Sequence, residues 1–122
     1  MLSSATPIAF LPSTDLERSR HFFADRLGLV VVDVSPFACV VRVGTTTLRI
    51  TKVDQLVPHP FTVFGWDVPD IYPVMAGLDV AFLRFDGMEQ DADGVWTAPG
   101  GSRIAWFRDP DGNTLSLTQF AR

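Results

Sequence analysis

The chain has 122 residues, of which 47% are apolar and 20% charged, a composition typical of one soluble globular domain. The formal net charge of -4 and the scatter of the ten Lys and Arg residues argue against binding to nucleic-acid phosphates. A single cysteine excludes an internal disulfide, and the absence of a basic leader or of a long apolar run favours a cytoplasmic protein without a membrane span.

The first half of the chain predicts a strand, a helix and three further strands. Residues 6–12 predict a short strand closed by proline, and a helix is expected to follow within residues 13–29. Thr14 and Glu17 have the spacing of a capping box at the helix start, and Gly28 is a natural stop. The three further strands are expected at residues 29–34, 37–43 and 46–53.

The second half predicts the same order of elements after a connector at residues 54–60. A short helix is expected over residues 69–78, with Pro69 in its first turn and Gly77 near its end. Pro73 weakens this assignment, because a proline beyond the first turn removes a hydrogen bond. A polar loop is expected at residues 86–94, strands are expected at residues 61–68, 80–85, 103–108 and 114–120, and a further short run at residues 95–99 completes the half.

The two halves also share short sequence matches. Asp15-Leu16 and Asp70-Ile71 each mark a helix start, and "LRITK" at residues 48–52 corresponds to "LSLTQ" at residues 115–119. With the matched element order, these similarities favour a tandem duplication. Alternating strands with only two helices predict an α+β protein, with an antiparallel-rich sheet and the helices outside it.

The acidic run "DPDGN" at residues 109–113 has two interpretations. Asp109, Asp111 and Asn113 occupy positions 1, 3 and 5 of a calcium-binding loop, but Thr114 and Phe120 stand where that loop needs glycine and glutamate. Asp-Pro-Asp-Gly fits a type I turn much better. We therefore expect a hairpin turn at this point.

The segments "STDLERSRHFFADRLGL" and "FRDPDGNTLSLTQ", with the two βαβββ halves, resemble the vicinal oxygen chelate superfamily. That superfamily includes glyoxalase I, extradiol dioxygenases, and fosfomycin- and bleomycin-resistance proteins. The resemblance covers nearly the whole chain. It implies a single domain of two tandem βαβββ modules, residues 1–57 and 60–122, which form a cupped mixed sheet with helices outside. It also implies a homodimer.

Metal-dependent members of the superfamily hold one divalent ion in the cup, through side chains from the first and last strands of each module. By resemblance, these four ligand positions fall on Ile8, Arg49, Val63 and Ser116. None of the four is an imidazole or carboxylate, the groups that such sites use. We therefore expect neither a divalent metal nor another cofactor.

Without a metal, the cup would still offer a pocket for a small molecule. Aromatic side chains on or beside the predicted strands suit a planar or amphipathic ligand, although for any one of them a position in the core is the favoured interpretation. The candidate ligand-binding residues are Phe10, Arg49, Phe64, Trp66, Trp96, Trp106 and Ser116.

Arg49 is the most distinctive candidate. Strand alternation places it on the same face as Thr47 and Thr51, and a buried arginine needs an anionic partner. That partner could be an acidic ligand, an internal carboxylate such as Asp67, or a carboxylate of a dimer mate.

Several other polar residues have two interpretations each. The acidic loop residues Glu89, Asp91 and Asp93 could attract a cationic drug, or they could simply be solvated. His21, in the first helix, and His59, in the connector, could be proposed as metal ligands, but solvent exposure is the more economical interpretation for both. The thiol of Cys39, in the middle of a strand, is expected to be buried.

Three functional hypotheses follow, in order of preference. The first is a metal-free protein that binds a small organic molecule, of the sequestration or resistance type. The second is a lyase, isomerase or dioxygenase-like enzyme with a divergent metal site or none, for which Glu89, Asp67 and His59 are candidate acids or bases. The third is a protein-interaction module.

Overall fold

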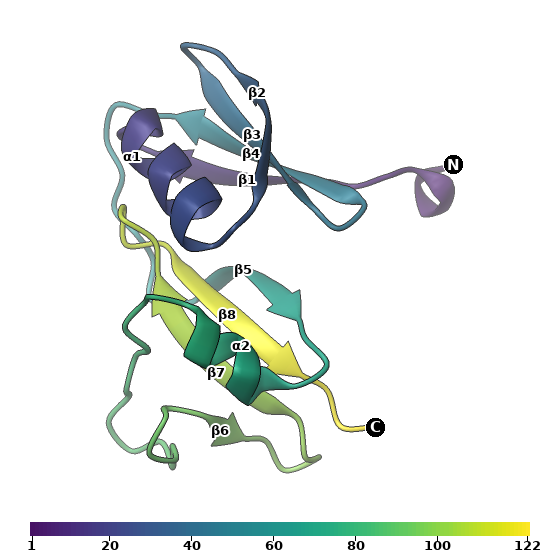
Figure 1. Ribbon diagram of the computed structural model, residues 1–122, viewed down its shortest axis with the longest axis vertical. Helices are drawn as coiled ribbons and strands as arrows, with labels where there is room; N and C mark the ends of the chain where they lie inside the picture. Colours follow the sequence, from purple (N-terminus) through teal and green to yellow (C-terminus); the bar gives the residue numbers. More distant parts are fainter. The chain divides into compact units, whose positions relative to one another are not determined.

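The computed structural model describes residues 1–122 and divides into two compact units. Unit 1 is Met1–Val57 and unit 2 is Pro58–Arg122. Each unit contains one four-stranded sheet in which parallel and antiparallel pairs are mixed (Figure 1). Each unit also repeats the element order βαβββ.

Unit 1 has the strand order β1-β4-β3-β2. The first and last strands pair in parallel, and the other neighbours are antiparallel. A short 3-10 turn precedes β1, and α1 continues directly into a π-helical turn. The elements are the 3-10 turn Leu2–Ser4, β1 Ile8–Ser13, α1 Leu16–Arg20, the π-helical turn His21–Arg26, β2 Val30–Val34, β3 Ala38–Val43 and β4 Thr46–Lys52.

The sheet of unit 1 buries one face and leaves the other exposed, because successive side chains of a strand point to opposite faces. α1 packs on β3 and β4, where Cys39, Val41, Leu48 and Ile50 are buried. We call the opposite face, which carries Ile8, Phe10, Thr47, Arg49 and Arg42, the open face of unit 1.

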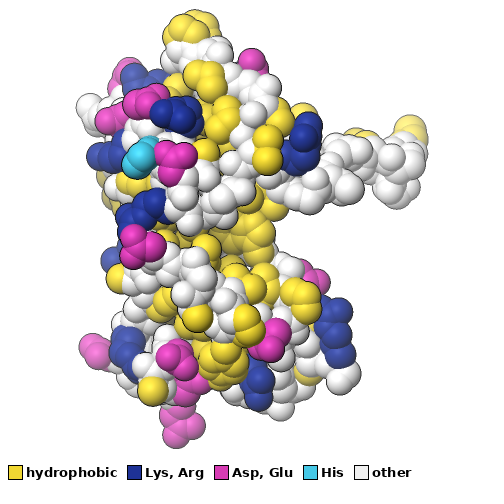
Figure 2. Space-filling model, in the orientation of Figure 1, with side chains coloured by type: hydrophobic (Ala, Val, Ile, Leu, Met, Phe, Trp, Pro, Cys, Tyr) yellow, Lys and Arg dark blue, Asp and Glu magenta, His cyan; other side chains and the backbone are white.

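The start of α1 differs from the predicted capping box. Asp15, not Thr14, is the N-cap residue, and its carboxylate accepts from the backbone N–H of Arg18 at 3.1 Å. Glu17 instead forms an ion pair with Arg20 one turn along. The prediction was wrong because aspartate caps a helix as well as threonine does, and a nearby guanidinium is a better partner for a carboxylate than a single N–H. Charged side chains of both signs gather over this helix in Figure 2.

Unit 2 repeats the arrangement with the strand order β5-β8-β7-β6, in which β5 and β8 are parallel. α2 packs on β7 and β8. Its elements are β5 Thr62–Asp67, α2 Ile71–Gly77, β6 Trp96–Thr97, β7 Arg103–Arg108 and β8 Thr114–Gln119.

The strand predicted at residues 80–85 is absent, which is the main error in the expected fold. This segment makes one backbone bond to β7, from Leu83 N–H to the carbonyl of Trp106 at 2.8 Å. The side chain of Gln90 donates a hydrogen bond to the carbonyl of Leu83 and accepts one from the N–H of Phe85. The edge position beside β7 belongs instead to the short strand β6. The alternating pattern of residues 80–85 therefore reflects packing on Phe107 and Trp106, not strand pairing.

The second helix begins two residues later than predicted. Asp70 is its N-cap residue, so Pro69 lies before the helix and Pro73 is its third residue. Since the first helical N–H groups have no intrahelical partner, Pro73 costs little there. The N–H of Ile71 donates to the side-chain oxygen of Gln119 on β8 at 2.9 Å, which ties the helix start to the sheet.

The turn at residues 109–112 is confirmed. The N–H of Gly112 donates to the carbonyl of Asp109 at 3.0 Å, and Gly112 has a φ of +87°. The buried carboxylate of Asp109 accepts from the N–H groups of Asp111 and Asn113 and from the Asn113 amide, at 2.8–3.0 Å. Burial raises the pKa of Asp109, although these hydrogen bonds oppose that shift. The acidic run thus organises a hairpin.

Neither α1 nor α2 has the length and hydropathy needed to cross a lipid bilayer.

Candidate functional site

The face of the unit 2 sheet that α2 does not cover brings together three of the predicted site residues. Ser116 on β8 lies between Gly65 on β5 and Trp106 on β7. Trp96 pairs with Ile104, the residue two before Trp106. We call this face, with Gly65, Trp96, Ile104, Trp106 and Ser116, the open face of unit 2.

Three aromatic rings form a cluster on this face. The ring centroids of Trp96 and Trp106 lie 6.3 Å apart, and the ring of Phe85 meets Trp106 edge to face at 5.4 Å. The indole N–H of Trp106 donates to the hydroxyl of Thr62 at 3.1 Å, which fixes the orientation of the indole. We call Phe85, Trp96 and Trp106 the aromatic cluster.

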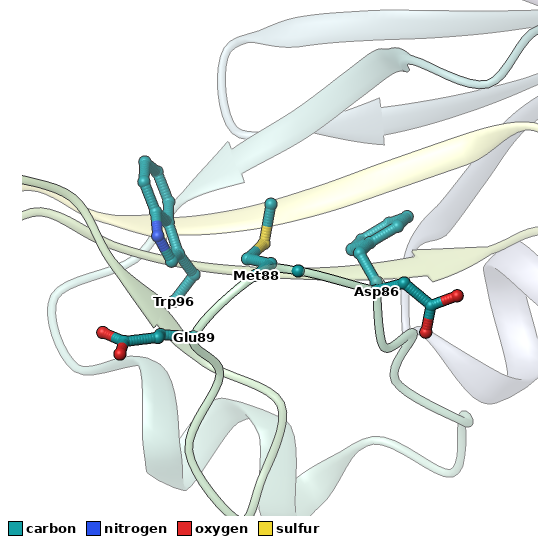
Figure 3. Close-up of a pocket in the computed structure, with 6 residues that line it drawn as sticks. Asp86, Met88, Glu89 and Trp96 are labelled. Atoms are coloured by element: carbon teal, nitrogen blue, oxygen red, sulfur yellow. The ribbon is translucent and has the colours of Figure 1, made fainter.

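A pocket of about 420 Å³ adjoins this cluster. In Figure 3 the side chains of Met88 and Trp96 point to the same side, while the carboxylates of Asp86 and Glu89 lie at opposite ends and point away. The pocket therefore has an apolar floor with acidic ends. Its lining residues are Phe85, Asp86, Gly87, Met88, Glu89 and Trp96.

The loop that bears the pocket is held by Gln90. Its side-chain oxygen accepts from the N–H of Phe85 at 2.7 Å, and its amide donates to the carbonyls of Leu83 and Gly94 at 2.9 and 2.8 Å. One side chain thus replaces the backbone pairing that a strand at residues 80–85 would have supplied.

Asp91 is a second organiser of the same loop. Its carboxylate accepts from the hydroxyl of Tyr72 at 2.6 Å and from the N–H groups of Asp93 and Val95 at 3.0 and 2.9 Å. Burial opposes ionisation, but these hydrogen bonds outweigh it and lower the pKa of Asp91. Asp91 therefore has a local structural role, whereas Glu89 lies at the pocket.

Phe64 and Trp66 lie on the opposite face, toward the core. They share that face with Leu115 and Leu117, and the ring of Trp66 stacks on the buried ring of Phe107 with centroids 6.1 Å apart. Phe64 meets Trp66 edge to face at 5.0 Å. The structure thus separates these two aromatics from Trp96 and Trp106.

Ser116 and Gly65 lie in close contact. A Cβ atom on Gly65 would be 2.4 Å from the hydroxyl oxygen of Ser116 and 2.9 Å from its carbonyl oxygen. A second hollow of about 250 Å³ opens at this point and is lined in part by both residues. Only a glycine at position 65 lets the Ser116 side chain adopt this position.

In unit 1, Phe10 and Arg49 are direct neighbours on the open face, because Phe10 pairs with Arg49 across β1 and β4. Phe10 is 62% exposed and Arg49 is half-buried. Asp67, one predicted partner of Arg49, forms an ion pair with Arg122 at 3.0 Å. That pair occupies Asp67 within unit 2.

The four positions that the resemblance assigns to metal ligands lie on strands β1, β4, β5 and β8, the first and last of each unit. Ile8 and Val63 offer no donor atom, Arg49 carries a fixed positive charge, and the hydroxyl of Ser116 is a weak ligand. The chain contains no group of three or more His, Cys, Asp or Glu side chains placed to hold an ion. These donors do not fit a divalent metal.

The remaining candidates lie away from the pocket lining. His21 is exposed and pairs with Asp25 on its own helix. His59 is exposed and stacks on Phe61 with ring centroids 5.1 Å apart. Cys39 is buried as expected, and burial raises the pKa of its thiol. A neutral thiol in the core is a packing group.

Sequence reasoning missed Phe85, Met88 and Gln90. Phe85 was assigned to a strand, and Met88 and Gln90 fell within an acidic loop whose charges dominated its interpretation. The only usable signal was the sequence "FDGME", where an aromatic residue and a methionine flank a turn glycine. Such a signal does not reveal that Gln90 folds the loop onto Trp96.

No protein-family model and no curated protein sequence matches this chain. Solved structures match it over nearly its whole length. A superfamily member from Sphaerobacter thermophilus, described as glyoxalase/bleomycin resistance protein/dioxygenase, has 22% identity and a TM-score of 0.74, covering 98% of this chain and 100% of that one.

Two further structures match in the same way. A bleomycin resistance determinant encoded on transposon Tn5 has 20% identity and a TM-score of 0.71, with 98% and 100% coverage. Lactoylglutathione lyase from Agrobacterium tumefaciens has 19% identity and a TM-score of 0.70, with 95% and 93% coverage. The fold expected from the sequence motifs is confirmed: the protein has the α+β fold of the glyoxalase/bleomycin resistance protein/dioxygenase superfamily, also known as the vicinal oxygen chelate superfamily.

Proposed function

We propose that the protein binds a planar or amphipathic small organic molecule on the open face of unit 2, without a metal ion. The observation that carries this proposal is the aromatic cluster beside the pocket of about 420 Å³. Indole and phenyl faces stack on flat ligands, and Met88 adapts to irregular shapes. The volume lies within the usual range for small-molecule sites.

The chemistry of the side chains supports a function without a metal. A divalent ion needs imidazole, carboxylate or thiolate ligands, and the positions that would supply them hold Ile8, Arg49, Val63 and Ser116. One protein of this fold is a bleomycin resistance determinant. Capture of a toxic small molecule is therefore the type of activity that we propose for this chain.

Tryptophan fluorescence tests the binding site, because all three tryptophans lie in unit 2. The probes are ethidium, a planar cation; 8-anilinonaphthalene-1-sulfonate, a planar anion; and 2-naphthol, a neutral ring. We expect at least one probe to bind with 1:1 stoichiometry. Trp106→Leu should weaken its binding at least tenfold.

Trp66→Phe is the matched control, since Trp66 packs against the core ring Phe107. This variant should lose stability but keep its affinity for the probe. The proposal is wrong if no probe binds, or if Trp106→Leu binds as tightly as the wild type.

Metal content tests the second part of the proposal. The purified protein should contain no stoichiometric metal, and probe affinity should not change when EDTA is added. One equivalent of bound zinc, nickel, iron or manganese would contradict it.

We also propose that the protein is a homodimer. β2 is an edge strand with three exposed valines, Val30, Val32 and Val34, at 60%, 40% and 59%. An exposed apolar edge is an unfavourable surface for a monomer. Light scattering on the protein as it elutes from a size-exclusion column should give twice the chain mass of 13.5 kDa.

A further inference from the structure

Two arginines lie close together on the open face of unit 1. Across β3 and β4, Arg42 pairs with Thr47 and Val40 pairs with Arg49. Arg42 and Arg49 are therefore diagonal neighbours on one face, with Cα atoms about 7–8 Å apart. We propose that these two guanidinium groups together hold the carboxylate of an organic anion.

Neither guanidinium has a partner within the chain. The structure contains no ion pair, hydrogen bond or ring contact for Arg42 or Arg49. Several other arginines are engaged, among them Arg20 with Glu17, Arg122 with Asp67, and Arg84 with the backbone carbonyls of Asp91 and Ala92. In a chain with a net charge of -4, two adjacent cations without a counter-charge are unusual.

The arrangement is unfavourable by itself, because like charges at neighbouring positions of a sheet repel each other. Arg49 is also half-buried, so its charge is less well hydrated than a fully exposed one. An anion placed between the two side chains removes the repulsion and can accept forked hydrogen bonds from each guanidinium.

The neighbours of the arginines indicate the chemical class of that anion. Phe10 pairs with Arg49, and Ile8 pairs with Thr47; these apolar side chains are 62% and 58% exposed. The hydroxyl of Thr47 can donate a further hydrogen bond. A planar carboxylate attached to an apolar or aromatic ring matches this surface better than a strongly hydrated inorganic phosphate does.

This inference extends the proposed binding function to a second surface, and it rests on that function only in the general sense that the protein binds small molecules. The two surfaces can be tested separately. Unit 1 contains none of the tryptophans, so quenching of tryptophan fluorescence by ethidium reports binding to unit 2. Calorimetry with a colourless anion, compared between the wild type and the arginine variants, reports binding to the arginine pair.

The experiment is isothermal titration of benzoate into the full chain at constant ionic strength, with acetate and inorganic phosphate as comparison anions. The variants are Arg42→Gln and Arg49→Gln. Arg108→Gln is the matched control, because Arg108 is an exposed arginine on a strand of unit 2. We expect each test variant to bind benzoate at least tenfold more weakly, and the control to bind as the wild type does.

A second measurement separates binding from structure. Because the variants remove a repulsion, Arg42→Gln and Arg49→Gln should unfold at the same or a higher urea concentration than the wild type. Benzoate should raise the melting temperature of the wild type and of Arg108→Gln, but not that of the test variants.

Three results would overturn the proposal: no benzoate binding to the wild type, equal benzoate affinity in all variants, or phosphate binding as tight as benzoate. Loss of ethidium binding with retention of benzoate binding would contradict the unit 2 proposal and leave this one standing. Phe10→Ala should reduce the preference for benzoate over acetate, and an unchanged preference would overturn the role given to the aromatic ring.

Discussion

Gly65 is the glycine at which an added side chain would meet the closest neighbour. A methyl group at this position would lie 2.4 Å from the Ser116 hydroxyl and 2.9 Å from the Ser116 carbonyl oxygen. The hydroxyl can rotate away, but the carbonyl oxygen belongs to the backbone of β8, which pairs with β5, so full relief requires the two strands to shift apart. Gly65→Ala should therefore lower the free energy of unfolding by about 1–3 kcal/mol, the range for overpacking.

Urea unfolding of Gly65→Ala and of the double variant Gly65→Ala/Ser116→Ala checks this prediction. The second change removes the hydroxyl but not the carbonyl oxygen, so it should restore only part of the lost stability. Gly77→Ala is the control, since a Cβ there meets nothing within 4 Å. Wild-type stability in Gly65→Ala would show that β5 and β8 are less closely paired than described.

Tyr72 offers a direct test of the hydrogen bond to Asp91, because it is the only tyrosine of the chain. That bond raises the pKa of Tyr72 above its ordinary value of 10.0. A raised pKa means that the bond contributes stability below about pH 10 and loses it as the tyrosine ionises at higher pH. Absorbance titration of the phenolate should show the raised pKa in the wild type.

In Asp91→Asn the Tyr72 titration should move back toward the ordinary value. The pKa of Asp91 is lowered, whereas that of Tyr72 is raised, so the same hydrogen bond also loses its stabilising effect at low pH. The ionised form of Asp91 contributes stability above its ordinary value of 3.8, and that contribution is lost as the pH falls through the lower folded-state pKa. An unchanged tyrosine titration in Asp91→Asn would contradict the bond.

At the scale of elements, the segment between α2 and β6 is held by the side chain of Gln90 and not by strand pairing. Gln90→Ala would leave the N–H of Phe85 and the carbonyls of Leu83 and Gly94 without their partner. The expected loss of stability is about 1–3 kcal/mol. Phe85 should also move away from Trp106, which would weaken probe binding about tenfold and shift the tryptophan emission to the red.

Gln119→Ala is the matched control for Gln90→Ala, because Gln119 also bonds a backbone N–H, that of Ile71. It should lower stability without changing probe affinity. If Gln90→Ala bound the probe as tightly as the wild type, Gln90 would be structural only. Gln90→Glu should not rescue binding, because a carboxylate cannot donate to two carbonyls.

The elements show how far the sequence predicts the structure. Seven of the eight strands of the structure fall where alternating apolar residues and turn residues place them, since burial of one sheet face imposes that pattern. The eighth, β6, is much shorter than the predicted run at residues 95–99. The predicted strand at residues 80–85 failed because the same alternation arises when an irregular segment packs on Phe107 and Trp106.

The candidate site was less predictable than the fold. Sequence reasoning placed Trp96, Trp106 and Ser116 among the candidates, and they share one face because their strand register aligns them. Sequence reasoning could not show that Phe64 and Trp66 lie on the other face of the sheet, since a shift of one residue in register moves a side chain from one face to the other. The irregularity in β5 near Val63 is such a shift, and nothing in the local sequence marks it.

At the scale of the whole chain, the two units are expected to unfold together, as the single domain that the sequence predicts. Each unit is close to the size at which an isolated domain is marginal, because roughly 60 residues bury only about 60% of their unfolded surface. Neither has a disulfide, since Cys39 is the only cysteine. Unit 1 also leaves Ile8 and Phe10 more than half exposed.

The chain supplies one natural probe for each unit. Cys39 in unit 1 is 1% exposed and its thiol pKa is raised by burial, so its reaction with a thiol reagent reports the opening of unit 1. Tryptophan emission reports unit 2. Because neither unit is expected to be stable alone, both signals should change at the same urea concentration and with the same slope. Thiol reactivity that appears well before the tryptophan transition would mean that unit 1 unfolds first and that the units are separate domains.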